Sequence, residues 1–154
     1  MINGQKVGGN VATYFCLSDG TVVHAVAGPV DAKRFLQEAR WAVDLRKLAV
    51  TESGGSVAKY RATVRKGHLE RLAAGTGLRL PANTLPQLTG GNPPVPHAEL
   101  LRLPGARGLD QHGQVSLLLA YYPLAKLDQL YPIVFERVLK EKVSTLPVDV
   151  VITK

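Results

Sequence analysis

Cysteine is nearly absent from this chain of 154 residues, and its scarcity excludes several kinds of chemistry. Cys16 stands alone, so the chain makes no internal disulfide and no zinc site built from several cysteines. No apolar run approaches the roughly 18 to 20 residues that cross a bilayer. The N-terminal stretch has no apolar segment followed by a small-residue cleavage site. We therefore expect a cytoplasmic protein without membrane contact.

The motifs of common enzyme classes are also missing. Three glycine-rich stretches, GGN, GTG and TGGN, lack the lysine and serine or threonine of a phosphate-binding loop. His24 with Ser18 and either Asp19 or Asp31 resembles a hydrolytic triad only in residue type, because no nucleophile elbow of the form Gly-x-Ser-x-Gly occurs. The four histidines show no spacing typical of a metal site. We therefore expect no catalytic residue, no cofactor and no metal.

The residues that are present indicate one folded domain covering 1–154. Hydrophobic residues make up 45% of the chain, enough for a substantial core. The net charge is +7, and the stretch 33–79 holds eleven basic and four acidic residues, an excess equal to the whole net charge. Such a region can attract nucleic acid, an acidic protein or anionic lipid, although basic residues on solvated helix faces also keep proteins soluble.

The first third of the chain predicts two strands and a helix. VATYFCL (11–17) and TVVHAVA (21–27) are rich in β-branched and aromatic residues, and SDG separates them. We expect a hairpin in which Asp19 and Gly20 both adopt positive φ. Asp31 is placed to cap a helix. Its expected buried stripe is Phe35, Leu36, Ala39, Ala42 and Val43, with Trp41, Leu45 and Leu48 on a second face.

The rest of the chain predicts a helical hairpin, a loop and a C-terminal unit. Gly54 and Gly55 break the first helix, and Ser56 caps a basic helix over 56–74. Six prolines and several glycines predict an irregular connection over 80–113. Residues 114–154 are expected to form a strand, a helix and a strand: a buried strand in QVSLLLAYYP (114–123), a helix over 124–143 interrupted by Pro132, and an edge strand in 146–154. The predicted fold class is therefore mixed α/β (α+β).

The motifs VATYFCLSDG, TVVHAVAGPVDA and FLQEA, within residues 7–50, resemble the C-terminal β-β-α half of a thioredoxin-like domain. The resemblance implies a hairpin that completes a sheet and a helix that covers one face of it. It also implies an upstream Cys-x-x-Cys pair and a cis-proline before the first strand. This chain has no second cysteine, and Val11 or Ala12 stands where that proline would be. The chain by itself therefore cannot carry out disulfide exchange by the family's mechanism.

Cys16 alternates with Ala12 and Tyr14 along the first strand, and we expect it to be buried and inert. His68 falls on the apolar side of the second helix, between Val64 and Leu72.

Three functional hypotheses follow. The favoured one is a non-catalytic thioredoxin-like interaction module, in which the C-terminal strands or a second copy of the chain complete the sheet. The second is weak, sequence-independent nucleic-acid binding, with phosphate contacts from Arg61, Arg65, Lys66 and Arg71. The third is that the chain is the C-terminal part of a longer thiol-disulfide oxidoreductase.

Overall fold

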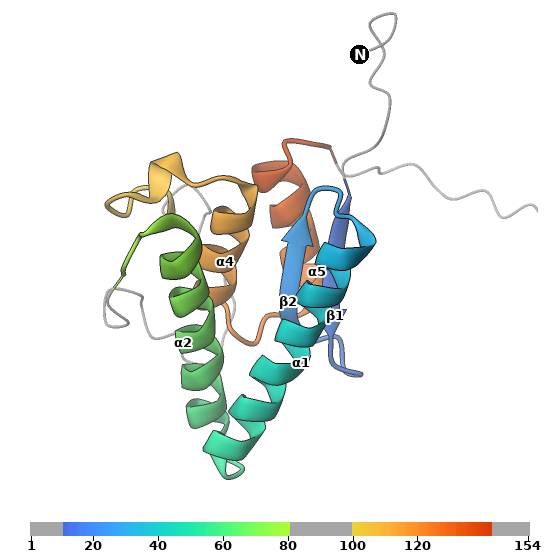
Figure 1. Cartoon of the computed structure of the whole chain (residues 1–154), viewed down its shortest axis with the longest axis vertical. Coiled ribbons are helices and arrows are strands. Elements are labelled where there is room, and N and C mark those ends of the chain that lie inside the picture. The colour runs from blue at the N-terminus through green and yellow to red at the C-terminus, as the bar shows by residue number, and fades with distance from the viewer. Residues whose placement is uncertain (1–10, 81–99, 143–154) are drawn as a thin grey trace, which may run out of the picture.

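A computed structural model of the protein describes residues 11–80 and 100–142. Within these ranges the chain forms a two-stranded antiparallel sheet and four α-helices, so the fold is mixed α and β and mostly helical, as predicted in outline (Figure 1). The elements, in chain order, are β1 (Ala12–Cys16), β2 (Val22–Ala27), α1 (Ala32–Ser53), α2 (Val57–Thr76), the short 3-10 helix η2 (Ala106–Gly108), α4 (Gln111–Tyr121), α5 (Leu127–Ile133) and the π-helical turn η3 (Val134–Val138).

The hairpin has its two strands where the sequence predicts them, but its turn is of another kind. Leu17 and Thr21 close a three-residue loop through a hydrogen bond from Leu17 N to Thr21 O at 2.8 Å. Gly20 has a φ of 80°, whereas Asp19 does not adopt positive φ. A three-residue hairpin loop of this kind needs one residue in the left-handed conformation at its end, and Gly20 is that residue. Asp19 instead accepts a hydrogen bond from Thr21 N at 2.9 Å.

Helices cover both faces of the hairpin. Figure 1 shows α1 crossing one face, with α5 and η3 behind the other and α4 beside β2. Val22 and Ala25 of β2 pack into the larger core with Leu118 of α4 and Leu130 of α5. The chain before α5 returns to the hairpin turn, where Val22 N donates to Ala125 O at 2.9 Å. All six residues of β2 are consequently buried.

The helices α1 and α2 form the predicted helical hairpin. The side chains of Asp31 and Ser56 cap them, accepting hydrogen bonds from Arg34 N at 2.7 Å and Lys59 N at 3.3 Å. Between the helices Gly54 and Gly55 have φ values of 53° and 88°, a left-handed conformation that glycine adopts at little cost. Both predicted caps and the predicted glycine break are confirmed.

The buried face of α1 differs from the predicted stripe. The helix buries Glu38, Ala42, Leu45, Ala49 and Ser53. Phe35, Leu36 and Val43 are about half exposed, and so is Leu48. The predicted stripe consisted of apolar residues alone and did not include Glu38. Burial of Glu38, which has polar partners in the interior, rotates the helix and leaves several apolar side chains outside.

The run QVSLLLAYYP, predicted as a buried strand, is mostly helix α4. Asp110 caps this helix by accepting a hydrogen bond from Gly113 N at 2.8 Å. Eight of its eleven residues are buried, because α2, β2 and η3 pack around it. A continuous apolar run fits a helix buried on all sides as well as a buried strand, so its periodicity does not separate the two.

The C-terminal helix begins at Leu127, and Pro132 lies inside it as predicted. Proline cannot donate a backbone hydrogen bond, which disturbs the helical ladder at this point. The helix continues as the wider turn η3, where Leu139 N donates to Val134 O at 2.9 Å. The predicted edge strand over 146–154 and most of the predicted irregular connection, 81–99, lie outside the described residues.

Candidate functional site

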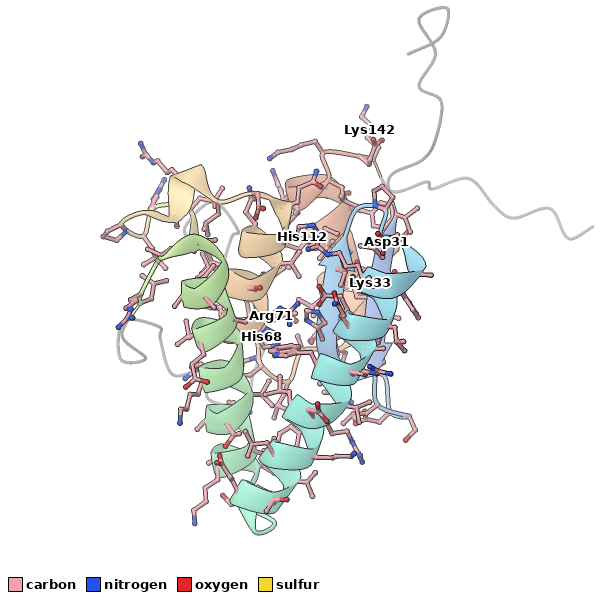
Figure 2. All side chains as sticks on the ribbon, viewed as in Figure 1. Asp31, Lys33, His68, Arg71, His112 and Lys142 are labelled. Atoms are coloured by element: carbon pink, nitrogen blue, oxygen red, sulfur yellow. The ribbon has the colours of Figure 1, made fainter. Side chains whose placement is uncertain are left out.

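The V-shaped gap between α1 and α2 contains a pocket of about 440 Å³. β2 forms its floor through His24, Ala25 and Val26, and the N-terminal end of α4 closes one side. Figure 2 shows His68 and Arg71 reaching from α2 toward the interior, with His112 of α4 beyond them. The pocket is lined by Arg71 and His112 but not by His68, and its other polar side chains are those of His24, Arg34, Glu38, Thr76, Asp110 and Ser116.

Glu38 is the centre of the charged groups. Its Oε2 accepts hydrogen bonds from His24 Nε2 at 2.8 Å and from Arg71 Nη2, and Arg34 Nε lies 3.5 Å from Oε1. The hydrogen bond from His24 is the main reason that the pKa of Glu38 falls from 4.5 to about 2, and both arginines lower it further. Glu38 is therefore an ionised carboxylate in the protein interior, held by three partners.

Two imidazoles lie side by side in the core behind this carboxylate. The ring centroids of His24 and His68 are 5.8 Å apart, and Trp41 meets both rings edge-on. Burial lowers the pKa of His68 to about 3 and lowers the pKa of His24 as well. Both rings are thus neutral near pH 7. His68 Nε2 lies 2.9 Å from Val23 O and must carry the proton, because a carbonyl oxygen only accepts.

In each neutral ring, one nitrogen makes a hydrogen bond and the other does not. Within the described part of the chain, Nδ1 of His24 and Nδ1 of His68 are buried and have no hydrogen-bond partner. Arg71 closes the cluster, with its guanidinium carbon 4.3 Å from the centroid of the Trp41 ring. A carboxylate and an imidazole at hydrogen-bond distance can hold a proton in place, and the guanidinium groups can bind an anion.

The structure separates the four residues predicted to contact nucleic acid. Arg71 points into the pocket, and Arg65 Nε donates to Ala120 O at 3.0 Å. Lys66 is exposed beside Glu70, 3.8 Å away, and Arg61 is half-buried one turn before Arg65. The four side chains do not share one face of α2, and two of the guanidinium groups have partners inside the molecule. Nucleic-acid binding through this set stays a prediction.

Sequence reasoning missed four residues of the cluster: Arg34, Glu38, Trp41 and His112. The signal for Glu38 was its helical spacing, because it lies four residues before Ala42 and seven before Leu45, both buried. A carboxylate on an apolar face needs a buried partner. The histidine in the otherwise apolar strand TVVHAVA was the available candidate.

The hydrolytic triad considered from the sequence, His24 with Ser18 and Asp19 or Asp31, is not formed. Asp31 caps α1, and Asp19 accepts a hydrogen bond from Lys126 at 2.6 Å.

A second feature lies on the outside, at β1. Gly28 N donates to Val11 O at 2.6 Å, and hydrogen-bonded pairs alternate along an antiparallel ladder. The backbone groups of Ala12, Tyr14 and Cys16 therefore point away from β2. In the described ranges the sheet has two strands, which leaves this edge of β1 open. Cys16 was predicted to be buried, and this is wrong: it is exposed, because it ends β1 beside the hairpin turn.

Helix α1 carries two parallel rows of exposed side chains. Leu36, Val43 and Val50, spaced by seven residues and thus on one face, are 50%, 50% and 51% exposed; we call them the apolar row. The basic row, Lys33, Arg40 and Lys47, has the same spacing and is exposed beside it. Phe35, which precedes the first residue of the apolar row, packs against Phe15 of β1 with the ring centroids 5.7 Å apart and the rings tilted by 40°. The N-terminal end of the apolar row therefore lies near β1.

No protein-family model, curated protein or solved structure matches the chain. Across residues 11–80 and 100–142, no helix is long and apolar enough to cross a membrane. The same ranges contain no group of three histidine, cysteine or acidic residues arranged to hold a metal ion.

Proposed function

We propose that this chain is a non-catalytic, thioredoxin-like protein-interaction module. The observation that carries the proposal is the open edge of β1 next to the apolar row of α1. An unpaired strand edge offers a row of backbone donors and acceptors to an incoming strand. β1 has no charged residue and no proline, the usual devices that keep such an edge from pairing.

The resemblance to the thioredoxin-like family supplies the second argument. Its β-β-α half has one strand edge that pairs with the rest of the sheet and a helix across one face. The β1–β2–α1 unit offers the same two surfaces on one side of the molecule (Figure 1). In the proposal, a partner protein contributes the strand that the family's other half would contribute.

The basic row gives the chemistry of the partner. An apolar row flanked by Lys33, Arg40 and Lys47 is complementary to an apolar surface flanked by carboxylates. A second copy of the chain fits less well, because its own basic row would meet this one. We therefore propose a partner that adds an extended strand to β1 and places acidic side chains next to α1.

Amide hydrogen exchange by NMR, with a defined probe, tests this proposal. The probe is a short synthetic peptide of alternating glutamate and valine, and its control is the same peptide with lysine in place of glutamate. We expect the glutamate peptide to slow exchange at Ala12, Tyr14 and Cys16, whose N–H groups face the open edge. Leu36→Lys should weaken this binding. Val57→Lys, at a 63% exposed valine outside the row, is the matched control and should not.

Three results would overturn the proposal. If the lysine peptide binds equally well, the partner does not need acidic side chains. If neither peptide protects the three amides, no strand is added to β1. If protection of these amides rises with protein concentration in the absence of peptide, and sedimentation shows a dimer, a second copy of the chain occupies the edge.

A further inference from the structure

We propose that the pocket between α1, α2 and the N-terminus of α4 binds a small organic carboxylate. This site is separate from the open edge of β1, so the inference does not depend on the interaction partner. It rests on three features of the described residues: a cavity of about 440 Å³, guanidinium groups at its wall, and a buried polar side chain with an unused nitrogen.

Arg34 is the residue best placed to meet a ligand. Its side chain is 46% exposed, and its Nε lies 3.5 Å from Glu38 Oε1. The terminal nitrogens of its planar guanidinium match the two oxygens of a carboxylate. Arg71 contributes a second guanidinium, already held in position by Glu38 and by the ring of Trp41.

The end of α4 adds a further attraction for negative charge. Asp110, His112 and Gly113 line the pocket at the first turn of this eleven-residue helix. The side chain of Asp110 accepts a hydrogen bond from Gly113 N. The N–H groups in the first turn of a helix have no hydrogen-bond partner within the helix itself. Such N–H groups, together with the helix dipole, favour a bound anion.

The independent observation is His24 in the floor of the pocket. This side chain is 3% exposed, and within the described residues its Nδ1 has no hydrogen-bond partner although Nε2 is bound to Glu38. A buried polar atom without a partner is rare in folded proteins. A ligand that bears a hydroxyl or amine near its carboxylate would supply the missing donor.

The charges inside the pocket oppose a dianion more strongly than a monoanion. Arg34 and Arg71 bring two positive charges, and Glu38 and Asp110 bring two negative ones. A phosphate dianion would meet two carboxylates without a surplus of positive charge. A carboxylate adds only one negative charge, and its two oxygens can pair with one guanidinium. The pocket is thus better suited to a carboxylic acid than to a phosphate ester.

Titration of the ¹⁵N-labelled protein tests this inference with three probes of graded charge. Benzoate is the carboxylate, benzyl alcohol is its neutral analogue, and inorganic phosphate is the dianion. We expect benzoate to shift the amides of His112 and Gly113 in a saturable manner. Arg34→Gln should weaken its binding about tenfold, the loss of one charge-assisted contact. Arg46→Gln removes an exposed arginine of the same helix that lies outside the pocket and outside the basic row, and it should leave binding unchanged.

Other outcomes would overturn the inference. Absence of saturable shifts with benzoate would show that no such site exists. Equal binding of benzyl alcohol would show that the pocket recognises the ring and not the charge. Tighter binding of phosphate would replace the carboxylate with a dianion. Unchanged affinity in Arg34→Gln would place bound benzoate elsewhere on the molecule.

Discussion

His24 on β2 and Glu38 on α1 form a buried hydrogen bond of 2.8 Å that ties the sheet to the first helix. Glu38 is 5% exposed and His24 is 3% exposed, so neither group exchanges this contact for water. Arg71 on α2 binds the same carboxylate. One acidic side chain thereby joins three elements, and the orientation of α1 follows from keeping that side chain inside.

Replacement of Glu38 by glutamine is therefore expected to destabilise the protein. The variant keeps the shape of the side chain, but it leaves Arg71 without its buried counter-charge. We expect a loss of about 2–3 kcal/mol in the free energy of unfolding, measured by urea denaturation. Glu52→Gln is the matched control on the same helix, where an exposed glutamate accepts a bond from Thr63 Oγ1 at 2.7 Å. It should cost less than about 1 kcal/mol; equal losses in the two variants would contradict the central role of Glu38.

Acid should unfold the protein through its buried histidine. The pKa of His68 is about 3 in the folded state because of burial, against its usual 6.5. Its contribution to stability is complete above pH 6.5 and is lost as the pH falls toward 3, because only the unfolded chain takes up the proton. The expected slope is about 1.4 kcal/mol per pH unit for one such group.

Urea denaturation at intervals between pH 6.5 and 4.5 measures this slope. In this range Glu38 does not add to the pH dependence of stability, because the usual pKa of its carboxyl is 4.5. The stability that Glu38 provides is lost at lower pH, between 4.5 and about 2. In His68→Gln the slope should fall by the contribution of one histidine. Burial also lowers the pKa values of His24 and His112, and these two residues account for the remaining slope. An unchanged slope in the variant would show that His68 is not a source of acid sensitivity.

Local signals predicted the first half of the fold well. The hairpin, both helix caps and the glycine break depend on neighbouring residues, and the structure has them where the sequence placed them. Apart from the type of the hairpin turn, the errors arose where tertiary packing decides. The run around Leu117 and Leu118 is apolar on all sides, so nothing in its periodicity separates a helix from a strand. The pocket was not predictable for the same reason: it requires knowing that Arg34, Arg71 and His112, from three helices, converge.

The predicted weak nucleic-acid binding should depend on the exposed Lys66 and not on the half-buried Arg71. Lys66→Gln is expected to lower the affinity for a labelled DNA of arbitrary sequence, and binding should fall steeply as salt rises. Arg71→Gln is expected to lower the melting temperature instead, because Arg71 supports Glu38. Fluorescence anisotropy at low and physiological ionic strength separates these effects. Binding that resists salt would contradict a purely electrostatic contact.

Cys16 should react with alkylating reagents in the folded protein. It is exposed at the end of β1, although partial burial raises the pKa of its thiol above the usual 9.0. The thiolate is the reactive form, so iodoacetamide should modify the native chain completely but more slowly than a small free thiol at the same pH. Mass spectrometry with time measures both rates, and the urea-unfolded chain provides the reference.

Because Cys16 lies on the open edge of β1, the peptide of glutamate and valine should slow the reaction and the lysine peptide should not. If the thiol stays unmodified in the native protein, Cys16 is buried, as the sequence predicted. Cys16 would then not be accessible at the proposed open edge of β1.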